Sequence, residues 1–97
     1  MAVTYDQARE LVREHFEPGW THGTFCLDDR MISENDEFYV FNVGAREFLI
    51  DEDDSYAIAG GVPIVFKEDG RLASRPSVMI ATDPSILSRP NPNPTLT

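Results

Sequence analysis

Near the start of the chain, apolar side chains recur every three or four positions between Tyr5 and Phe16. This spacing gathers them on one face of a helix and leaves the charged side chains on the other face. Thr4 is a good N-cap, and Gln7 three residues later completes a capping box. Pro18 follows the segment and ends it. The pattern therefore predicts an amphipathic helix that buries one stripe against another element.

From residue 24 onward the apolar period changes to two, which indicates strands. The segment Phe38–Val43 is apolar on both faces, so we expect it to lie inside a sheet. Lys67–Gly70 contains an Asp-Gly pair typical of a hairpin turn. Pro63 lacks a backbone donor, which places it at the start of a strand or on an edge. The predicted strands are Thr24–Ile32, Phe38–Val43, Val62–Phe66 and Arg71–Ala73.

Several short segments between and after these strands are less regular. Phe48–Ile50 is predicted as a short strand, and Val78–Ile80 as an extension of the last strand or the start of another. Asp83–Leu87 resembles one helical turn with Asp83 as its cap. Gly60–Gly61 is predicted as a tight bend.

One helix followed by hairpin-linked strands is typical of an α+β domain. We expect the N-terminal helix to pack on a mainly antiparallel sheet of four to five strands. A length of 97 residues fits a single domain, with expected bounds 1–88. Prolines at alternate positions from Pro90 to Pro94 block regular structure, so residues 89–97 are expected to form an extended, disordered tail.

The net charge of the chain excludes some classes of binding partner. Lys and Arg number 8 against 17 Asp and Glu, which gives a formal net charge of −9. Binding to nucleic acid or to an anionic membrane needs clustered cations, so neither is expected as a partner. No apolar run approaches the roughly 20 residues that cross a bilayer, and no secretory signal begins the sequence. A single cysteine fits a reducing compartment, and we expect a cytoplasmic location.

The negative charge is concentrated in one stretch. Between residues 28 and 54, ten acidic minus two basic residues leave −8 of the total −9. Such a concentration can steer a basic partner, although acidic loops also serve solubility alone. Trp20 is open to a role in the core or as an exposed anchor. The candidate partner-binding residues are Asp36, Glu37, Asp51, Glu52, Asp53, Asp54, Tyr56 and Trp20.

No catalytic set emerges from the sequence. His15, His22 and Cys26 contain the groups of a thiol nucleophile and its base, yet nothing local supplies an oxyanion site. The same three residues do not have the number or spacing of zinc ligands. We therefore expect a protein that is not an enzyme and that has neither a cofactor nor a metal site.

The acidic segment that starts at Asp51 partly follows the calcium loop of an EF-hand. Acidic and hydroxyl residues alternate there, but Tyr56 stands at the position that needs glycine. Val62 stands where the bidentate glutamate belongs. The match fails at its two most demanding positions, and weak calcium binding is left open.

The order of short motifs in the second half resembles a known family. An aromatic strand at Tyr39–Phe41 is followed by a Gly-Gly-x-Pro-hydrophobic-Val run at Gly60–Val65 and a Lys-x-Asp-Gly turn at Lys67–Gly70. This order is similar to the YrhB-like domain, the immunity protein 35 family of bacterial polymorphic toxin systems. The N-terminal helix rich in Ala and Leu matches as well, so the resemblance spans about Thr4 to Leu72.

The resemblance implies a small cytosolic protein that neutralises a cognate toxin without catalytic residues of its own. Our leading hypothesis is therefore an immunity-type protein that occludes the active site of a basic toxin domain. Members of the family are also discussed as chaperone-like proteins. The alternative is a chaperone-like or structural protein that acts through protein contacts or self-association, for example at a strand edge near Pro63 or Leu72. The sequence leaves the oligomeric state open.

Overall fold

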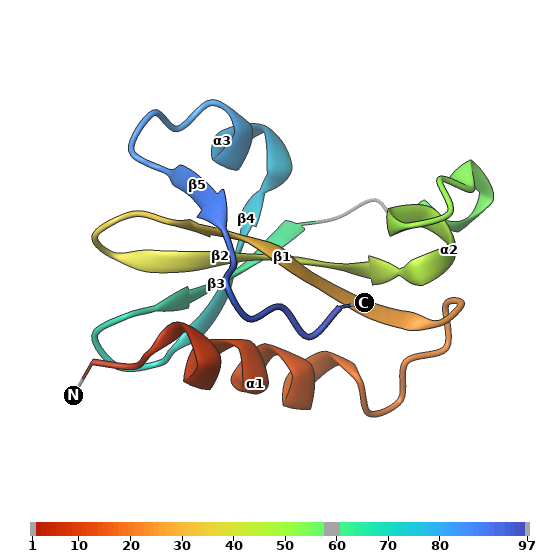
Figure 1. Cartoon of the computed structure of the whole chain (residues 1–97), viewed down its shortest axis with the longest axis horizontal. Helices are drawn as coiled ribbons and strands as arrows, with labels where there is room; N and C mark the ends of the chain where they lie inside the picture. Colours follow the sequence, from red (N-terminus) through yellow and green to blue (C-terminus); the bar gives the residue numbers. More distant parts are fainter. Residues whose placement is uncertain (1, 58–60, 97) are drawn as a thin grey trace.

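A computed structural model of the chain describes residues 2–57 and 61–96. Helix α1 lies against one face of a five-stranded antiparallel sheet with the strand order β4-β3-β2-β1-β5 (Figure 1). The predicted α+β class is confirmed. The elements are α1 (Tyr5–Phe16), β1 (Phe25–Glu34), β2 (Phe38–Ala45), α2 (Arg46–Leu49), the 3-10 turn η1 (Asp54–Tyr56), β3 (Gly61–Phe66), β4 (Leu72–Pro76), α3 (Ser77–Ala81) and β5 (Leu87–Pro90).

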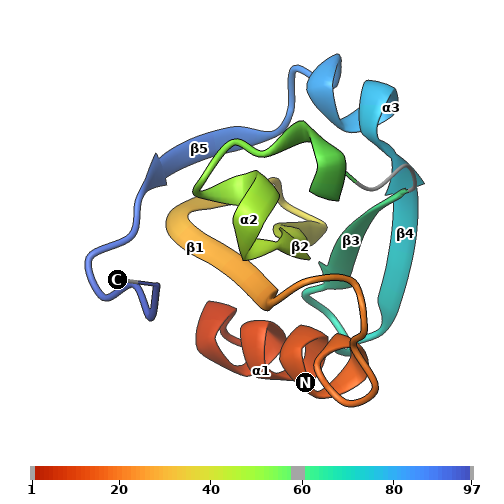
Figure 2. The same ribbon diagram turned by 90° about the vertical axis from the view of Figure 1, so that its right-hand side faces the viewer.

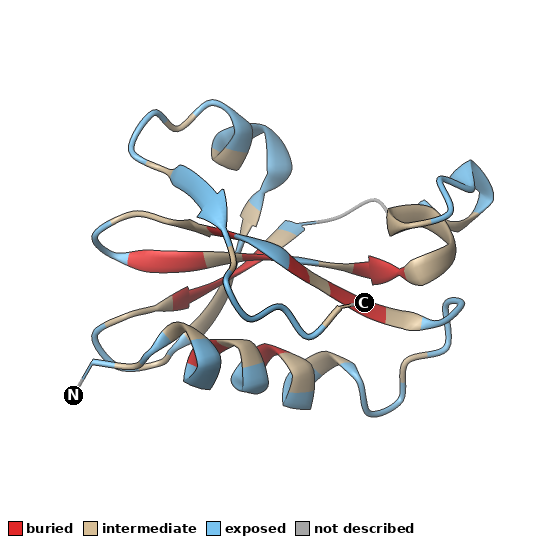
Figure 3. Cartoon of the chain, viewed as in Figure 1, coloured by how far each residue is buried: buried red, intermediate tan, exposed pale blue. Residues whose placement is uncertain are grey.

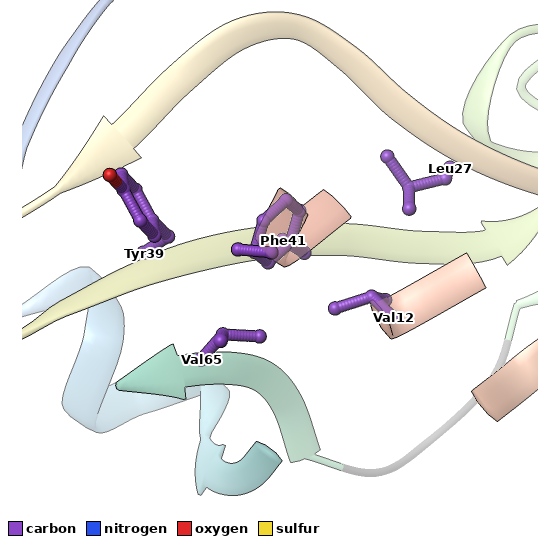
Figure 4. Packing of buried hydrophobic residues seen from close by; sticks show 6 residues of the cluster. Val12, Leu27, Tyr39, Phe41 and Val65 are labelled. Atoms are coloured by element: carbon purple, nitrogen blue, oxygen red, sulfur yellow. The ribbon is translucent and has the colours of Figure 1, made fainter. Parts of the chain in front are cut away.

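Helix α1 begins and packs as its sequence predicts. The Thr4 hydroxyl accepts the Gln7 backbone N–H, and the Gln7 side chain accepts the Thr4 N–H, which completes the capping box. Ala8 and Val12 on its inner face are fully buried. They join a core cluster with Leu27, Tyr39, Phe41 and Val65 of the sheet. Figure 4 shows Val12 of the helix and the four sheet side chains around one shared interior.

Burial is concentrated between α1 and the three middle strands (Figure 3). Strand β2 pairs with β1 on one side and β3 on the other, which confirms its predicted interior position. Pairing of β3 with β2 starts at Ile64, so Pro63 precedes that ladder and its missing donor costs no bond there. Gly70, at φ +76°, closes the hairpin between β3 and β4 in a conformation that favours glycine.

Two short strand predictions were wrong, and a predicted capped turn was right in part. Phe48 and Leu49 belong to α2, and Val78–Ile80 lies inside α3. Asp83–Leu87 forms a turn in which Asp83 accepts the Ser85 N–H, and Leu87 already belongs to β5. An apolar run of three residues fits a helical turn as well as a strand, so distant contacts decide between them. Gly60 of the predicted bend lies outside the described residues.

The C-terminal segment differs from the expected disordered tail. Leu87–Pro90 pairs with Met31–Glu34 as strand β5, so the expected boundary at residue 88 falls inside a strand. Residues 91–96 then run across β1 towards α1 (Figures 1 and 2). The Asn91 side chain donates to the Asp29 carbonyl at 2.7 Å, and Thr95 and Leu96 bind the Asp29 carboxylate. Hydrogen bonds therefore hold residues 91–96 in place.

Candidate acidic binding surface

The structure divides the ten acidic residues between positions 28 and 54 into bound and free groups. Two of the bound ones are held chiefly by ion pairs, and a third, Asp29, also lies 3.4 Å from Arg9. Asp28 pairs with Arg30 at 2.7 Å, and this pair lies beside a hollow of about 570 Å³ on the sheet face opposite α1. Glu34 binds Lys67 and Arg89, each at 2.7 Å. These carboxylates stabilise the sheet and offer little free charge to a partner.

Two further acids are bound by neutral hydrogen-bond donors. Asp29 is fully buried and accepts bonds from Thr95 and Leu96. Both oxygens of Glu47 lie 3.0 Å from the Thr24 backbone N–H, and these hydrogen bonds lower the pKa of Glu47. The carboxylates of Asp29 and Glu47 therefore stabilise the fold, although in the sequence they belong to the same acidic stretch as the others.

The six remaining acids are all exposed, and no described residue forms an ion pair with any of them. They are the candidate carboxylates named from the sequence. The structure separates them into a turn pair, Asp36 and Glu37, and an acidic loop, Asp51–Asp54. The turn pair precedes β2 and the acidic loop follows its far end, about 25 Å away along an eight-residue strand (Figure 1). The candidate residues therefore do not form one surface.

The acidic loop has a defined backbone path. Asp51 N–H donates to the Arg46 carbonyl, and Asp53 N–H donates to the Glu47 carbonyl at 2.8 Å, so the chain turns back at the end of α2. Glu52 adopts φ +59°, a left-handed conformation that costs free energy in a residue other than glycine. Asp53 accepts bonds from both the backbone and the hydroxyl of Ser55. The loop thus presents its charges from a fixed turn.

The segment before β1 braces this loop. Besides the bond to Glu47, Thr24 accepts the Arg46 N–H at 2.8 Å. A ring nitrogen of His22 lies 3.0 Å from the Tyr56 carbonyl oxygen. Gly23 adopts φ +69°, and a Cβ at that position would approach Glu47 to 2.6 Å. Only glycine combines this backbone conformation with such close packing.

Trp20 and Tyr56 lie at the same end of the molecule as the acidic loop. The Trp20 indole N–H donates to the His22 carbonyl at 2.8 Å, and its ring meets Phe25 edge to face at 5.5 Å. The Tyr56 ring contacts the His22 ring at 5.9 Å. Both aromatic side chains are half-buried, so each supports the fold while part of it faces solvent. The structure therefore places five of the eight candidate residues in one segment, Asp51–Tyr56, and links Trp20 to it through His22.

The three groups considered for catalysis, Cys26, His15 and His22, form no hydrogen bond or ring contact with one another. Cys26 is buried, and burial, with the nearby charge of Asp28, raises the pKa of its thiol. His15 packs on Phe16, and no hydrogen bond joins either histidine to Cys26. No cluster of three or more metal-ligating side chains occurs among the described residues. Nor does any helix in residues 2–57 or 61–96 have the length and apolar character needed to cross a membrane.

Sequence reasoning missed a basic pair at strand β4, formed by Arg71 directly before the strand and Arg75 within it. Arg71 and Arg75 both lie over the ring of Phe66, with Cζ 4.4 and 5.8 Å from the ring centroid. The available signal was their spacing, because residues four apart on a strand share a face.

Comparison of the chain with protein-family models, with curated proteins and with solved structures gives no match. The resemblance to the YrhB-like domain therefore stays a prediction.

Proposed function

We propose that this protein binds a basic protein domain through its acidic loop, as an immunity-type protein that covers the active site of a cognate toxin in the bacterial cytoplasm. The single observation that carries this proposal is the run of four adjacent, exposed carboxylates in Asp51–Asp54 that form no ion pair with any described residue. Four adjacent carboxylates on a braced turn create a local field that steers a cationic surface towards them.

The surroundings of the loop suit protein recognition. Tyr56 closely follows the acidic loop, and Trp20 is linked to Tyr56 through His22; both are partly exposed aromatic residues, a type that often anchors protein interfaces. Occlusion of an active site requires no chemistry from the inhibitor. A buried Cys26 with a raised pKa is consistent with that role.

The proposal predicts a charge-dependent association rate. A pull-down from the source cell with the wild-type chain should retain a basic protein. The double variant Asp51→Asn/Glu52→Gln should bind that protein about tenfold more slowly at low salt, because the loop steers the encounter, and the difference should shrink as salt is added. Stopped-flow or biosensor kinetics measure both rates. An unchanged rate would remove the loop from the interface.

The matched control is Asp36→Asn/Glu37→Gln, which removes the same two types of charge at the other end of β2. We expect its association rate to remain close to that of the wild type. The captured domain should arrest growth when it is expressed alone, and co-expression of the wild-type chain should restore growth. If expression of the domain alone does not arrest growth, the result would support the acidic loop as a docking surface and contradict the immunity function.

The alternative function is a chaperone-like or structural role through apolar contacts. It is favoured by large apolar side chains on α3 and β5 that are more than half exposed: Val78 at 66%, Met79 at 55% and Leu87 at 71%. Exposed apolar groups of this size can mark a contact surface for another chain.

A further inference from the structure

Two arginines at one edge of the sheet lack the carboxylate partners that four other arginines of the chain have. Across the residues that the structure describes, no carboxylate lies within ion-pair distance of Arg71 or Arg75. Arg9, Arg13, Arg30 and Arg89 all have such partners. In a chain with a net charge of −9, an unneutralised pair of cations is a local exception.

Strand pairing fixes where these two side chains lie. Leu72 pairs with Val65 and packs against the core under α1. Side chains alternate along a strand, so Arg71 and Arg75 share the opposite face, where Phe66 also lies as the partner of Phe38. Both guanidinium groups converge on the single Phe66 ring, which restricts their motion. Arg75 Nη1 donates to the Ser74 carbonyl at 3.3 Å, and the remaining N–H groups of the two guanidiniums form no hydrogen bond with the described residues.

The same strand has an unpaired edge. β4 is the first strand in the order β4-β3-β2-β1-β5, and no described segment pairs with its outer side (Figure 2). Part of the backbone N–H and C=O groups between Leu72 and Pro76 therefore faces away from β3. A free row of this kind can accept an additional strand.

We propose that the β4 edge binds an extended acidic segment of a partner protein by strand addition, with carboxylates of that segment bound by Arg71 and Arg75. Backbone hydrogen bonds to β4 provide the alignment, and bidentate pairing of guanidinium with carboxylate provides the selection for acidic side chains. This surface is distinct from the acidic loop and accepts the opposite charge.

The acidic loop of a second copy is a less suitable occupant. Asp53–Tyr56 is folded into a capped 3-10 turn rather than an extended strand. Two copies also repel each other through their net charges of −9. The charge complementarity therefore favours an acidic strand from a different protein.

The test uses the full-length chain and a synthetic peptide in which Glu alternates with Val, with a Gln-for-Glu peptide as the reference probe. Calorimetry should show binding of the Glu peptide, and the Gln peptide should bind at least about tenfold more weakly. The variant Arg71→Gln/Arg75→Gln should lose about the same factor for the Glu peptide. The control Arg30→Gln/Arg89→Gln removes two exposed, ion-paired arginines and should bind normally.

Amide hydrogen exchange separates strand addition from simple charge attraction. Bound Glu peptide should slow exchange at the outward-facing N–H groups of Leu72–Pro76, whereas binding by the side chains alone would leave those rates unchanged and overturn the proposal. Equal affinity for the Gln peptide, or no binding of either peptide, would equally overturn it. In that case the two arginines only protect the edge against pairing. Near-UV circular dichroism should confirm that the variants keep the wild-type packing around Phe66.

Discussion

Asp29 is fully buried, yet both of its carboxylate oxygens have hydrogen-bond donors. Thr95 donates through its N–H and its hydroxyl, each at 2.8 Å, and Leu96 donates through its N–H at 3.0 Å. Arg9 lies 3.4 Å away. Burial alone would raise the pKa of Asp29, but the bonds from Thr95 and Leu96, together with Arg9, outweigh it and lower the pKa. The residue is therefore ionised in the folded chain.

Replacing Asp29 with Asn should destabilise the fold by about 1–3 kcal/mol near neutral pH, because the amide group directs its own N–H donors at the donors of the tail. The lowered pKa of Asp29 means that its contribution is complete above the unfolded pKa of about 4 and is lost as the pH falls through the folded value. Urea unfolding of both proteins from pH 7 to pH 2 measures this. The difference in the free energy of unfolding between the wild type and Asp29→Asn should decrease as the pH falls. A difference that does not change with pH would contradict the ionised state of Asp29.

At the scale of elements, regular periodicity predicted the structure well and short segments did not. Helix α1, strand β2 and the hairpin of β3 and β4 contain enough alternating positions to define a period. α2 and α3 have four and five residues, too few to show one. Strand β5 depends on pairing with β1, more than fifty positions away in the chain, and no local pattern reports such a contact.

Local sequence patterns were also insufficient to predict how the candidate residues are arranged on the surface. The sequence selected the six free carboxylates, because turns rich in acidic residues are usually exposed. It could not show that the turn pair and the acidic loop lie at opposite ends of β2. It also could not show that Arg71 and Arg75 meet on one ring, because convergence on Phe66 depends on the register of β3 with β4.

The segment 92–96 should act as a structural element. Truncation after Asn91 removes Thr95 and Leu96 and leaves Asp29 with Arg9 alone, so we expect a loss of about 2–4 kcal/mol in the free energy of unfolding. The truncated Asp29→Asn protein should be no less stable than the truncated wild type, because the two changes act on the same bonds. Additive losses in this double-mutant cycle would show that the tail stabilises the fold elsewhere.

At the scale of the whole molecule, the distribution of charge matters more than its total. The fold pairs Asp28 and Glu34 with cationic side chains, binds Glu47 through the Thr24 N–H, and leaves unpaired negative charge at two separate ends, while the β4 edge is positive. A partner therefore meets surfaces of different sign depending on the direction of approach. Both proposed surfaces are independent, and each can be inactivated without the other.

The oligomeric state separates the proposed function from its alternative. Net repulsion between copies leads us to expect a monomer of 10.9 kDa in native mass spectrometry. A stable homo-oligomer that dissociates in the variant Met79→Asp would favour the structural or chaperone-like role instead. A monomer that binds a basic protein would favour the immunity-type role.

The hydrogen bonds from Thr95 to the buried Asp29 carboxylate also affect how the chain folds during synthesis. The two residues lie 66 positions apart, so Asp29 is synthesised long before the neutral donors that bind its carboxylate. A nascent chain can form α1 and the first hairpin, but until Thr95 and Leu96 have been added the Asp29 carboxylate has only Arg9 as a partner. Translation that stalls before Thr95, or proteolysis that removes it, should thus release a chain that unfolds easily and is degraded, even though most of its sheet is present.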